Sequence, residues 1–327
     1  MAGSDFVSRP DVRSFIDSMS EEYGIAIAEL ERILGDVRVS TTALRLTNPA
    51  PSTAPSPARS YARYRSKFLT PELISAGSRF WSLHARDLAR AEAEYGVPAQ
   101  VILGVLGVET FFGRNTGSFR AIDTLATIAF DGERRQDYFR GELKEFLLLA
   151  RDTGIDPLSV KGSYAGAMGL PQFMPSSYRK YAVDYDADGA IDLLGSPADA
   201  IGSIASYMKA FGWVPNETPA APVRLLRGSE PELVSGLERV HDVSEVQNKG
   251  VVFSGRDPPG GLVSIFELPT PGEPSKYFAG FTNFEVVTRY NRSTFYASAV
   301  LELGDAIQKA HNVVQLATAE QPEIALQ

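Results

Sequence analysis

Apolar residues recur at helical spacing through most of the first 213 residues. Apolar positions lie three and four residues apart with polar residues between them, which is the pattern of an amphipathic helix. Proline or serine stands at several expected helix starts, and glycine follows several ends, as at Gly96 and Gly113. The pattern predicts helices over residues 9–24, 27–37, 70–95, 98–112, 140–151 and 196–213.

The pattern changes after Trp213. Prolines and glycines separate short runs that are rich in β-branched and aromatic residues, namely GVVFSG, GLVSIFEL and NFEVVTRY. We therefore expect a small β-containing subdomain over residues 214–283. Residues 292–310 return to a helical pattern, and we expect them to pack on the helical core.

These patterns divide the chain into five consecutive parts. The connector Asn48–Ser60 is rich in proline, serine and alanine and cannot supply a core, so it should run extended. The expected parts are N-terminal helices with this connector (1–60), a helical core with an acidic loop (61–213), the β-containing subdomain (214–283), a segment returning to the core (284–313) and a frayed tail (314–327).

Composition excludes several classes of protein. The formal net charge of −8 argues against a nucleic-acid partner, which would require a basic face. No run approaches the roughly 18 apolar residues of a membrane span. The chain has no cysteine, which excludes disulfides and thiolate chemistry, and its three histidines have no metal-binding spacing: His84, His241 and His311.

Glu109 interrupts an otherwise apolar helix. On a helical period it shares a face with Ile102 and Val105, where a charged carboxylate is costly unless it is paired or protonated. One interpretation is a buried glutamate bonded to an arginine or a backbone amide. The other is a general acid whose pKa is raised by desolvation. Elsewhere on this helix, Gly104 and Gly107 lack side chains and let another backbone come close.

A run of aspartates follows the pattern of an EF-hand loop. Gly189 stands at position 6, where such a loop turns sharply, but Gly195 replaces the usual glutamate at position 12. Asp199, four residues later, is the candidate closing ligand. Close carboxylates repel one another unless a hard cation neutralises them, so we expect Ca²⁺ in a structural role, with a solvated acidic turn as the alternative. The expected ligands are Asp184, Asp186, Asp188, Asp192 and Asp199.

The stretch from Lys161 to Ala182 has the small residues of a loop that approaches a ligand closely. Ser163 and Gln172 offer neutral hydrogen-bonding groups, which suit sugar hydroxyls and acetamides. Three aromatic neighbours can stack on sugar faces or pack in a core: Tyr164, Phe173 and Tyr178.

Six motifs occur in an order that resembles the membrane-bound lytic transglycosylase B family, the soluble 35-kDa-type murein transglycosylases of Gram-negative bacteria. The resemblance covers about residues 64–310. Its motifs are GVPAQVILGVLGVETFFGRNTGSFRAIDTLATIAFD, RRQDYFRGEL, KGSYAGAMGLPQFMPSSYRKYAVD, DADGAIDL, DAIGSIASYMKAFGW and TRYNRSTFYASAV.

The resemblance implies a mainly α fold, with a lysozyme-like catalytic core and a small inserted β-containing subdomain. It also implies cleavage of the β-1,4 bond between N-acetylmuramic acid and N-acetylglucosamine, leaving a 1,6-anhydromuramic end. By match to the GVET motif, Glu109 is the sole catalytic acid/base. Positions that match sugar-binding or groove-lining residues are Ser163, Gln172, Tyr207, Tyr290 and Asn291. Arg134 and Arg135 match a pair suited to peptide-stem carboxylates, with ordinary surface arginines as the alternative.

Two other functions stay open. A hydrolytic muramidase would need a second carboxylate to activate water, for which Asp123 or Asp131 is the candidate. A calcium-dependent peptidoglycan-binding protein without catalysis is the other, and the intact Glu109, Ser163 and Gln172 argue against it. The expected partner is the peptidoglycan glycan strand, in the periplasm of a Gram-negative bacterium. An outer-membrane association would depend on a leader that this chain does not show.

Overall fold

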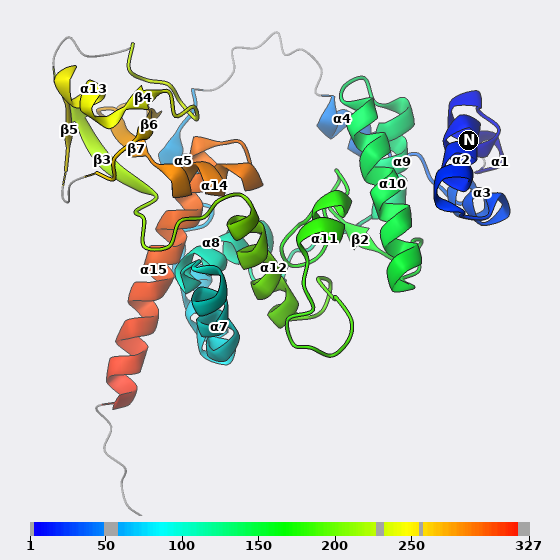
Figure 1. Cartoon of the computed structure of the whole chain (residues 1–327), viewed down its shortest axis with the longest axis horizontal. Helices are drawn as coiled ribbons and strands as arrows, with labels where there is room; N and C mark the ends of the chain where they lie inside the picture. The colour runs from blue at the N-terminus through cyan, green and yellow to red at the C-terminus, as the bar shows by residue number, and fades with distance from the viewer. Residues whose placement is uncertain (1–2, 49–57, 227–231, 255–257, 320–327) are drawn as a thin grey trace, which may run out of the picture. The chain divides into compact units, whose positions relative to one another are not determined.

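The computed structural model describes residues 3–48, 58–226, 232–254 and 258–319, and it is mainly helical with a small β part (Figure 1). This confirms the fold class expected from the sequence. The connector at residues 48–60 lies largely outside the described residues, as does the tail from residue 320.

The chain forms two compact units, each built from two stretches of sequence. The first unit comprises Met1–Pro55 and Gly113–Ser203, and the second comprises Ser56–Phe112 and Ile204–Gln327. The helical core expected over residues 61–213 therefore contributes to both units. The division into five consecutive parts stays a prediction.

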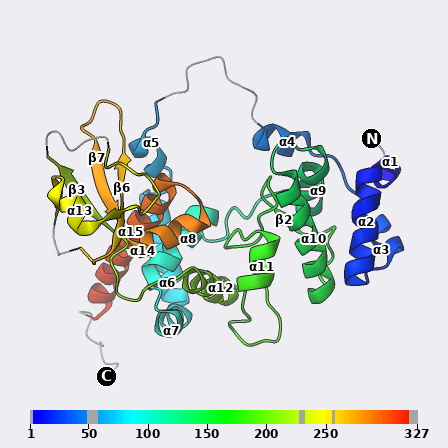
Figure 2. The ribbon, with the colours of Figure 1, turned by 45° about the horizontal axis from the view of Figure 1, so that its top comes forward.

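The first unit centres on two long helices that pack against each other, α9 (Ala121–Asp131) and α10 (Gln136–Thr153) (Figures 1 and 2). The sequence pattern did not predict α9, because almost all its residues are apolar or small and buried, which hides the helical period. The other elements are α1 (Gly3–Val7), α2 (Pro10–Tyr23), α3 (Ile27–Gly35), α4 (Thr41–Thr47), α11 (Pro175–Tyr181), the start of α12 (Pro197–Ala210), β1 (Phe119–Arg120) and β2 (Lys161–Gly162).

The second unit holds most of the remaining helices: α5 (Tyr61–Arg65), α6 (Pro71–Leu83), α7 (Ala85–Tyr95), α8 (Ala99–Thr110), α14 (Thr282–Tyr290) and α15 (Thr294–Ala319). The single helix expected over residues 70–95 is wrong, because the backbone breaks at His84 (φ −117°, ψ 26°) between α6 and α7. The long helix α15 continues to Ala319 (Figure 1), so residues 314–319 are helical where the sequence predicted a frayed tail.

The second unit also contains a five-stranded antiparallel sheet in the order β4-β6-β7-β3-β5. One face packs with the short helix α13 (Val243–Asn248) around a small apolar core that includes Val246, Val263 and Ile265. The strands are β3 (Ala220–Leu225), β4 (His241–Asp242), β5 (Val251–Phe253), β6 (Leu262–Leu268) and β7 (Lys276–Gly280).

The run NFEVVTRY is a helix, α14, and its expected β character is wrong. Its β-branched residues also fit a helical period, since Phe284, Val287 and Thr288 are buried while Arg289 is exposed. Tertiary packing selects the helix: the Phe284 ring stacks on Phe266 of β6 at a centroid distance of 4.4 Å.

Helices α8 and α15 cross so closely that glycine is required on both. A Cβ atom added to Gly104 would lie 2.2 Å from the Val300 carbonyl oxygen, and one added to Gly304 would lie 2.2 Å from that of Gln100. The close approach of another backbone at Gly104 is confirmed. At Gly107 the neighbour is the Leu303 side chain, 2.6 Å from an added Cβ.

Candidate active site

Glu109 lies near the C-terminal end of α8, in the second unit, after a continuous run of buried residues. The Tyr296 hydroxyl of α15 donates a hydrogen bond to Glu109 Oε1 at 2.6 Å. Among the described residues, no arginine or backbone amide bonds to this carboxyl group. Its surroundings therefore favour the second interpretation from the sequence, a desolvated acid.

Burial raises the pKa of Glu109 from 4.5 to about 7, and the hydrogen bond from Tyr296 opposes this rise. The two effects change the pKa in opposite directions. Apolar surroundings destabilise the charged carboxylate and raise its pKa, whereas a hydrogen-bond donor stabilises the carboxylate and lowers its pKa. A carboxyl group with a pKa near neutrality exchanges a proton readily in either direction at physiological pH.

Tyrosines surround Glu109. Burial, together with the negative charge of Glu109, raises the pKa of Tyr64 and Tyr290, so both phenols stay protonated. The Tyr290 ring stacks on Tyr296 at 6.4 Å and packs edge-on against Tyr207 at 5.0 Å. The second unit thus brings together two predicted groove residues and the candidate acid.

Tyr207 also anchors the end of α14, since its hydroxyl donates to the Arg289 carbonyl oxygen at 2.8 Å. Asn291 follows α14 directly and is exposed. Its carbonyl oxygen accepts a hydrogen bond from the Ser293 amide at 2.7 Å, at the turn into α15. The TRYN motif therefore forms the corner between two helices that carry tyrosines beside Glu109.

Ser163 and Gln172 lie in one loop of the first unit. The Ser163 Oγ accepts from the Ala167 amide at 3.0 Å, which leaves its hydroxyl hydrogen to donate. Gln172 has a left-handed backbone (φ 51°), and its Nε2 donates to the Thr116 and Gly169 carbonyls at 3.0 and 2.9 Å. With both amide hydrogens engaged, its carbonyl oxygen is the group suited to accept a hydrogen bond from a ligand.

Arg134 and Arg135 lie just before α10 and are both exposed. The Arg135 guanidinium lies 4.1 Å from the centre of the Tyr138 ring. The backbone of Arg135 has the left-handed conformation (φ 58°). The pair belongs to the first unit, and its binding role stays a prediction.

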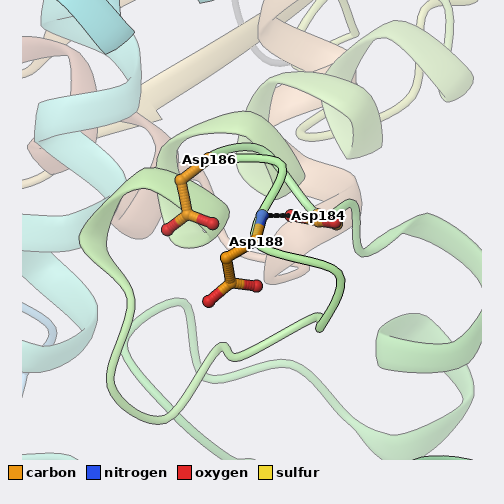
Figure 3. A group of neighbouring side chains, drawn as sticks. All are labelled: Asp184, Asp186 and Asp188. Atoms are coloured by element: carbon orange, nitrogen blue, oxygen red, sulfur yellow. Dashed lines mark hydrogen bonds between the residues drawn. The ribbon is translucent and has the colours of Figure 1, made fainter.

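The acidic loop of the first unit brings three of the five expected ligands together. Ligand oxygens of Asp184, Asp186 and Asp188 lie within 4.8 Å of one another (Figure 3). The chain turns back at Gly189 (φ 95°), so that the Asp188 and Gly189 amides donate to the Asp184 carboxylate at 3.1 and 2.9 Å. Three hard oxygen donors in one loop fit a calcium ion.

Asp192 and Asp199 are outside this group of three. Asp199 is buried and accepts hydrogen bonds from the Tyr185 and Asp192 amides at 2.6 and 2.7 Å. Asp192 accepts from the Leu194 and Gly195 amides at 2.8 and 2.9 Å. Both carboxylates shape the loop, and their assignment as calcium ligands stays a prediction.

The two candidate second carboxylates are held in ion pairs of the first unit. Asp123 pairs with Arg120 at 2.9 Å and accepts from the Arg38 amide at 3.0 Å. Asp131 pairs with Arg9 at 2.6 Å. Both carboxylates are engaged by guanidinium groups, which disfavours both as activators of water.

Sequence reasoning missed Tyr296, although it lies in the quoted motif TRYNRSTFYASAV. The available signal was a hydroxyl on the face of α15 that also carries Val300, Leu303 and Ile307, all fully buried. A buried tyrosine hydroxyl needs a hydrogen-bond partner. Which partner it finds depends on how α15 packs on α8.

The family model described as the transglycosylase SLT domain matches residues 8–305. Membrane-bound lytic murein transglycosylase B of Escherichia coli K12 is 42% identical over 315 residues, which cover 94% of this chain and 85% of that protein.

Solved structures of lytic transglycosylases are also similar. SltB1 from Pseudomonas aeruginosa gives a TM-score of 0.88 at 44% identity, covering 94% of this chain and 100% of that chain. E. coli Slt35 in complex with calcium gives 0.86 at 41% identity, covering 94% and 96%. P. aeruginosa SltB3 in complex with NAG-NAM-pentapeptide gives 0.79 at 29% identity, covering 91% and 79%.

Proposed function

Because the chain belongs to the transglycosylase SLT domain family, we propose that it is a peptidoglycan lytic transglycosylase and that Glu109 is its single acid/base. The observation that carries this assignment is the apolar setting of Glu109, with a pKa near 7 and a hydrogen bond from Tyr296. The fold is lysozyme-like with an inserted β part, as in similar lytic transglycosylases.

The reaction needs one proton to be given and one to be taken. Protonated Glu109 donates its proton to the departing glycosidic oxygen as the bond from muramyl C1 breaks. The muramyl N-acetyl oxygen stabilises C1. The Glu109 carboxylate then removes the proton of the muramyl 6-hydroxyl, whose oxygen attacks C1 and closes the 1,6-anhydro ring. Glu109 ends protonated, so one carboxyl group with a near-neutral pKa serves both steps.

Neutral groups orient the sugar in this proposal. The Ser163 hydroxyl donates to the substrate, and the Gln172 carbonyl oxygen accepts from a hydroxyl or an acetamide N–H. Tyr207, Tyr290 and Asn291 line the groove near Glu109, and Arg134 and Arg135 bind carboxylates of the peptide stem. SltB3, a relative, is known in complex with NAG-NAM-pentapeptide. We place the protein in the periplasm of a Gram-negative bacterium, where peptidoglycan lies. Among the described helices, none has the length and hydropathy of a membrane span.

The product tests this function. Purified protein incubated with peptidoglycan should release fragments with a 1,6-anhydromuramic end, lighter by one water than the products of a hydrolase. Mass spectrometry of the soluble fragments distinguishes the two. Hydrated reducing ends as the main product would show a muramidase, and no released fragment would favour a binding protein without catalysis.

We expect Tyr296→Phe to move the alkaline limb of the pH–rate profile upward. The limb in wild type follows loss of the Glu109 proton near pH 7, and the Tyr296 hydrogen bond lowers that pKa. Removing a hydrogen bond to a charged group should raise the pKa of Glu109 by about one to two units, because such a bond contributes roughly 1.5–3 kcal/mol net and one pKa unit corresponds to about 1.36 kcal/mol.

Tyr207→Phe is the matched control, because its hydroxyl bonds the Arg289 carbonyl oxygen and not Glu109. The rate of muropeptide release is measured between pH 5 and 9 for wild type and for both variants. An unshifted limb in Tyr296→Phe, or an equal shift in Tyr207→Phe, would contradict the role given to Tyr296.

Calcium should raise the thermal stability of the protein without taking part in the proton transfers. The site binds through Asp184, Asp186 and Asp188, whose mutual repulsion a divalent cation removes. A ligand at 100 times its Kd stabilises the native state by about 2.7 kcal/mol. Melting temperatures in calcium and in chelator should therefore differ by several degrees.

The double variant Asp184→Ala/Asp188→Ala should erase this difference. Asp137→Ala, on an exposed aspartate elsewhere in the first unit, should keep it. Coincident wild-type melting curves with calcium and with chelator would show that the loop is not a significant calcium site.

A further inference from the structure

Three arginines gather in the second unit beside the TRYN corner. Arg289 and Arg292 flank Tyr290 and Asn291, and Arg239 reaches the same place from the segment before β4. Together they line a hollow of about 350 Å³. The predicted groove residues of the TRYN motif, Tyr290 and Asn291, do not account for this cluster of positive charge.

Glu285 organises the cluster. Its Oε2 accepts from Arg239 Nε and its Oε1 accepts from Arg289 Nη2, both at 2.7 Å. Arg239 is fixed further by donating to Thr282 Oγ1 at 3.0 Å. One carboxylate therefore holds two guanidinium groups in place, and it neutralises only one of the two charges.

Arg292 adds a third positive charge. It is exposed, and no described residue forms an ion pair with it. Among the described residues that line the hollow, the only other carboxylate is that of Glu238, which is exposed. Three arginines against two glutamates leave a net positive charge in a concave site, which favours a ligand with carboxylate groups.

The cluster is connected to the candidate acid through a short series of contacts. Tyr207 donates to the Arg289 carbonyl oxygen at 2.8 Å, and its ring packs on Tyr290 at 5.0 Å. Tyr290 stacks on Tyr296, which bonds Glu109. The hollow and Glu109 therefore belong to the same unit and are linked through α14 and α15. An extended peptide of four or five residues spans roughly 13–18 Å, which allows a stem to reach beyond the sugar that carries it.

We propose that Arg239, Arg289 and Arg292 form a binding site for carboxylates of the peptide stem that hangs from N-acetylmuramic acid. This inference rests on the proposed function, because it requires a peptidoglycan substrate at Glu109. The site belongs to the second unit, whereas the Arg134–Arg135 pair belongs to the first. It makes stem-bearing strands better substrates than bare glycan.

The test compares two substrates for one enzyme: glycan strands that carry stems, and the same strands after an amidase has removed the stems. In Arg289→Gln/Arg292→Gln, kcat/KM on stem-bearing strands should fall about 5- to 30-fold, as expected for two partly exposed charge-assisted hydrogen bonds. On bare strands it should stay within about twofold of wild type. Lys276→Gln, on an exposed lysine of the same unit, is the matched control and should change neither rate.

Binding gives a readout that is independent of turnover. In the Glu109→Gln background, the same double substitution should weaken affinity for the disaccharide NAG-NAM-pentapeptide and leave affinity for the peptide-free disaccharide unchanged. Equal losses on both ligands, or no loss on either, would overturn the stem-binding role. Absence of anhydro products from the wild-type enzyme would instead overturn the proposed function, so the two failures are distinguishable.

Discussion

Glu109→Gln should abolish the release of anhydromuropeptides while the protein still folds and binds glycan. Glutamine keeps the shape of the side chain and can still accept from Tyr296, but it cannot transfer a proton. Loss of general acid catalysis costs about 10²–10⁴ in rate, and a residue that serves both steps should cost at least the upper value. Fragment release by mass spectrometry measures the loss.

The same substitution should stabilise the protein at alkaline pH. The pKa of Glu109 is about 7 in the folded state against 4.5 in the unfolded state. Between these values the folded state keeps a proton that the unfolded state releases, so the free energy of unfolding falls as pH rises through this window. The full loss, present above pH 7, is on the order of 3 kcal/mol.

The Glu109→Gln protein does not lose stability in this way as pH rises. Its free energy of unfolding should therefore exceed that of wild type by little at pH 4 and by most near pH 8. Denaturant unfolding at the two pH values measures it. A folded Glu109→Gln protein that releases anhydro fragments at near wild-type rate would refute the catalytic assignment. A stability advantage that does not depend on pH would refute the raised pKa.

Gly304→Ala should be strongly destabilising. An added Cβ would lie 2.2 Å from the Gln100 carbonyl oxygen, a backbone atom of α8 that cannot move without shifting the helix. Overpacking a close helix crossing costs typically 1–3 kcal/mol and more where backbone must separate, so we expect about 2–4 kcal/mol. Gly104→Ala should be destabilising to a similar extent, because its added Cβ would meet the Val300 carbonyl oxygen of α15.

These variants should also lose activity in the fraction that remains folded, because α8 carries Glu109 and α15 carries Tyr296. Gly141→Ala is the matched control: this glycine lies in helix α10 with nothing within 4 Å of an added Cβ. It should gain about 0.5–1 kcal/mol from helix propensity. If Gly304→Ala proved as stable as Gly141→Ala in urea unfolding, the crossing would not be as close as described.

The sequence was sufficient for features whose signal is local. Helix ends are examples: Gly24 and Gly96 adopt the left-handed conformation that glycine allows, with φ of 68° and 73°. Glu109 was found because one charged residue in an apolar face is costly wherever the helix packs. The aspartates that the structure groups were found because a loop of six residues fixes their spacing.

Other features depend on contacts between distant segments, and only the tertiary structure decided them. NFEVVTRY is compatible with a strand or a helix, and stacking of Phe284 on Phe266 made it α14. Tyr296 is 187 residues from Glu109 along the chain, and the close crossing of α8 and α15 brings its hydroxyl to the carboxyl group. The sequence determined that Glu109 must be paired or protonated; the packing of α15 decided its partner, and with it the balance that sets its pKa near 7.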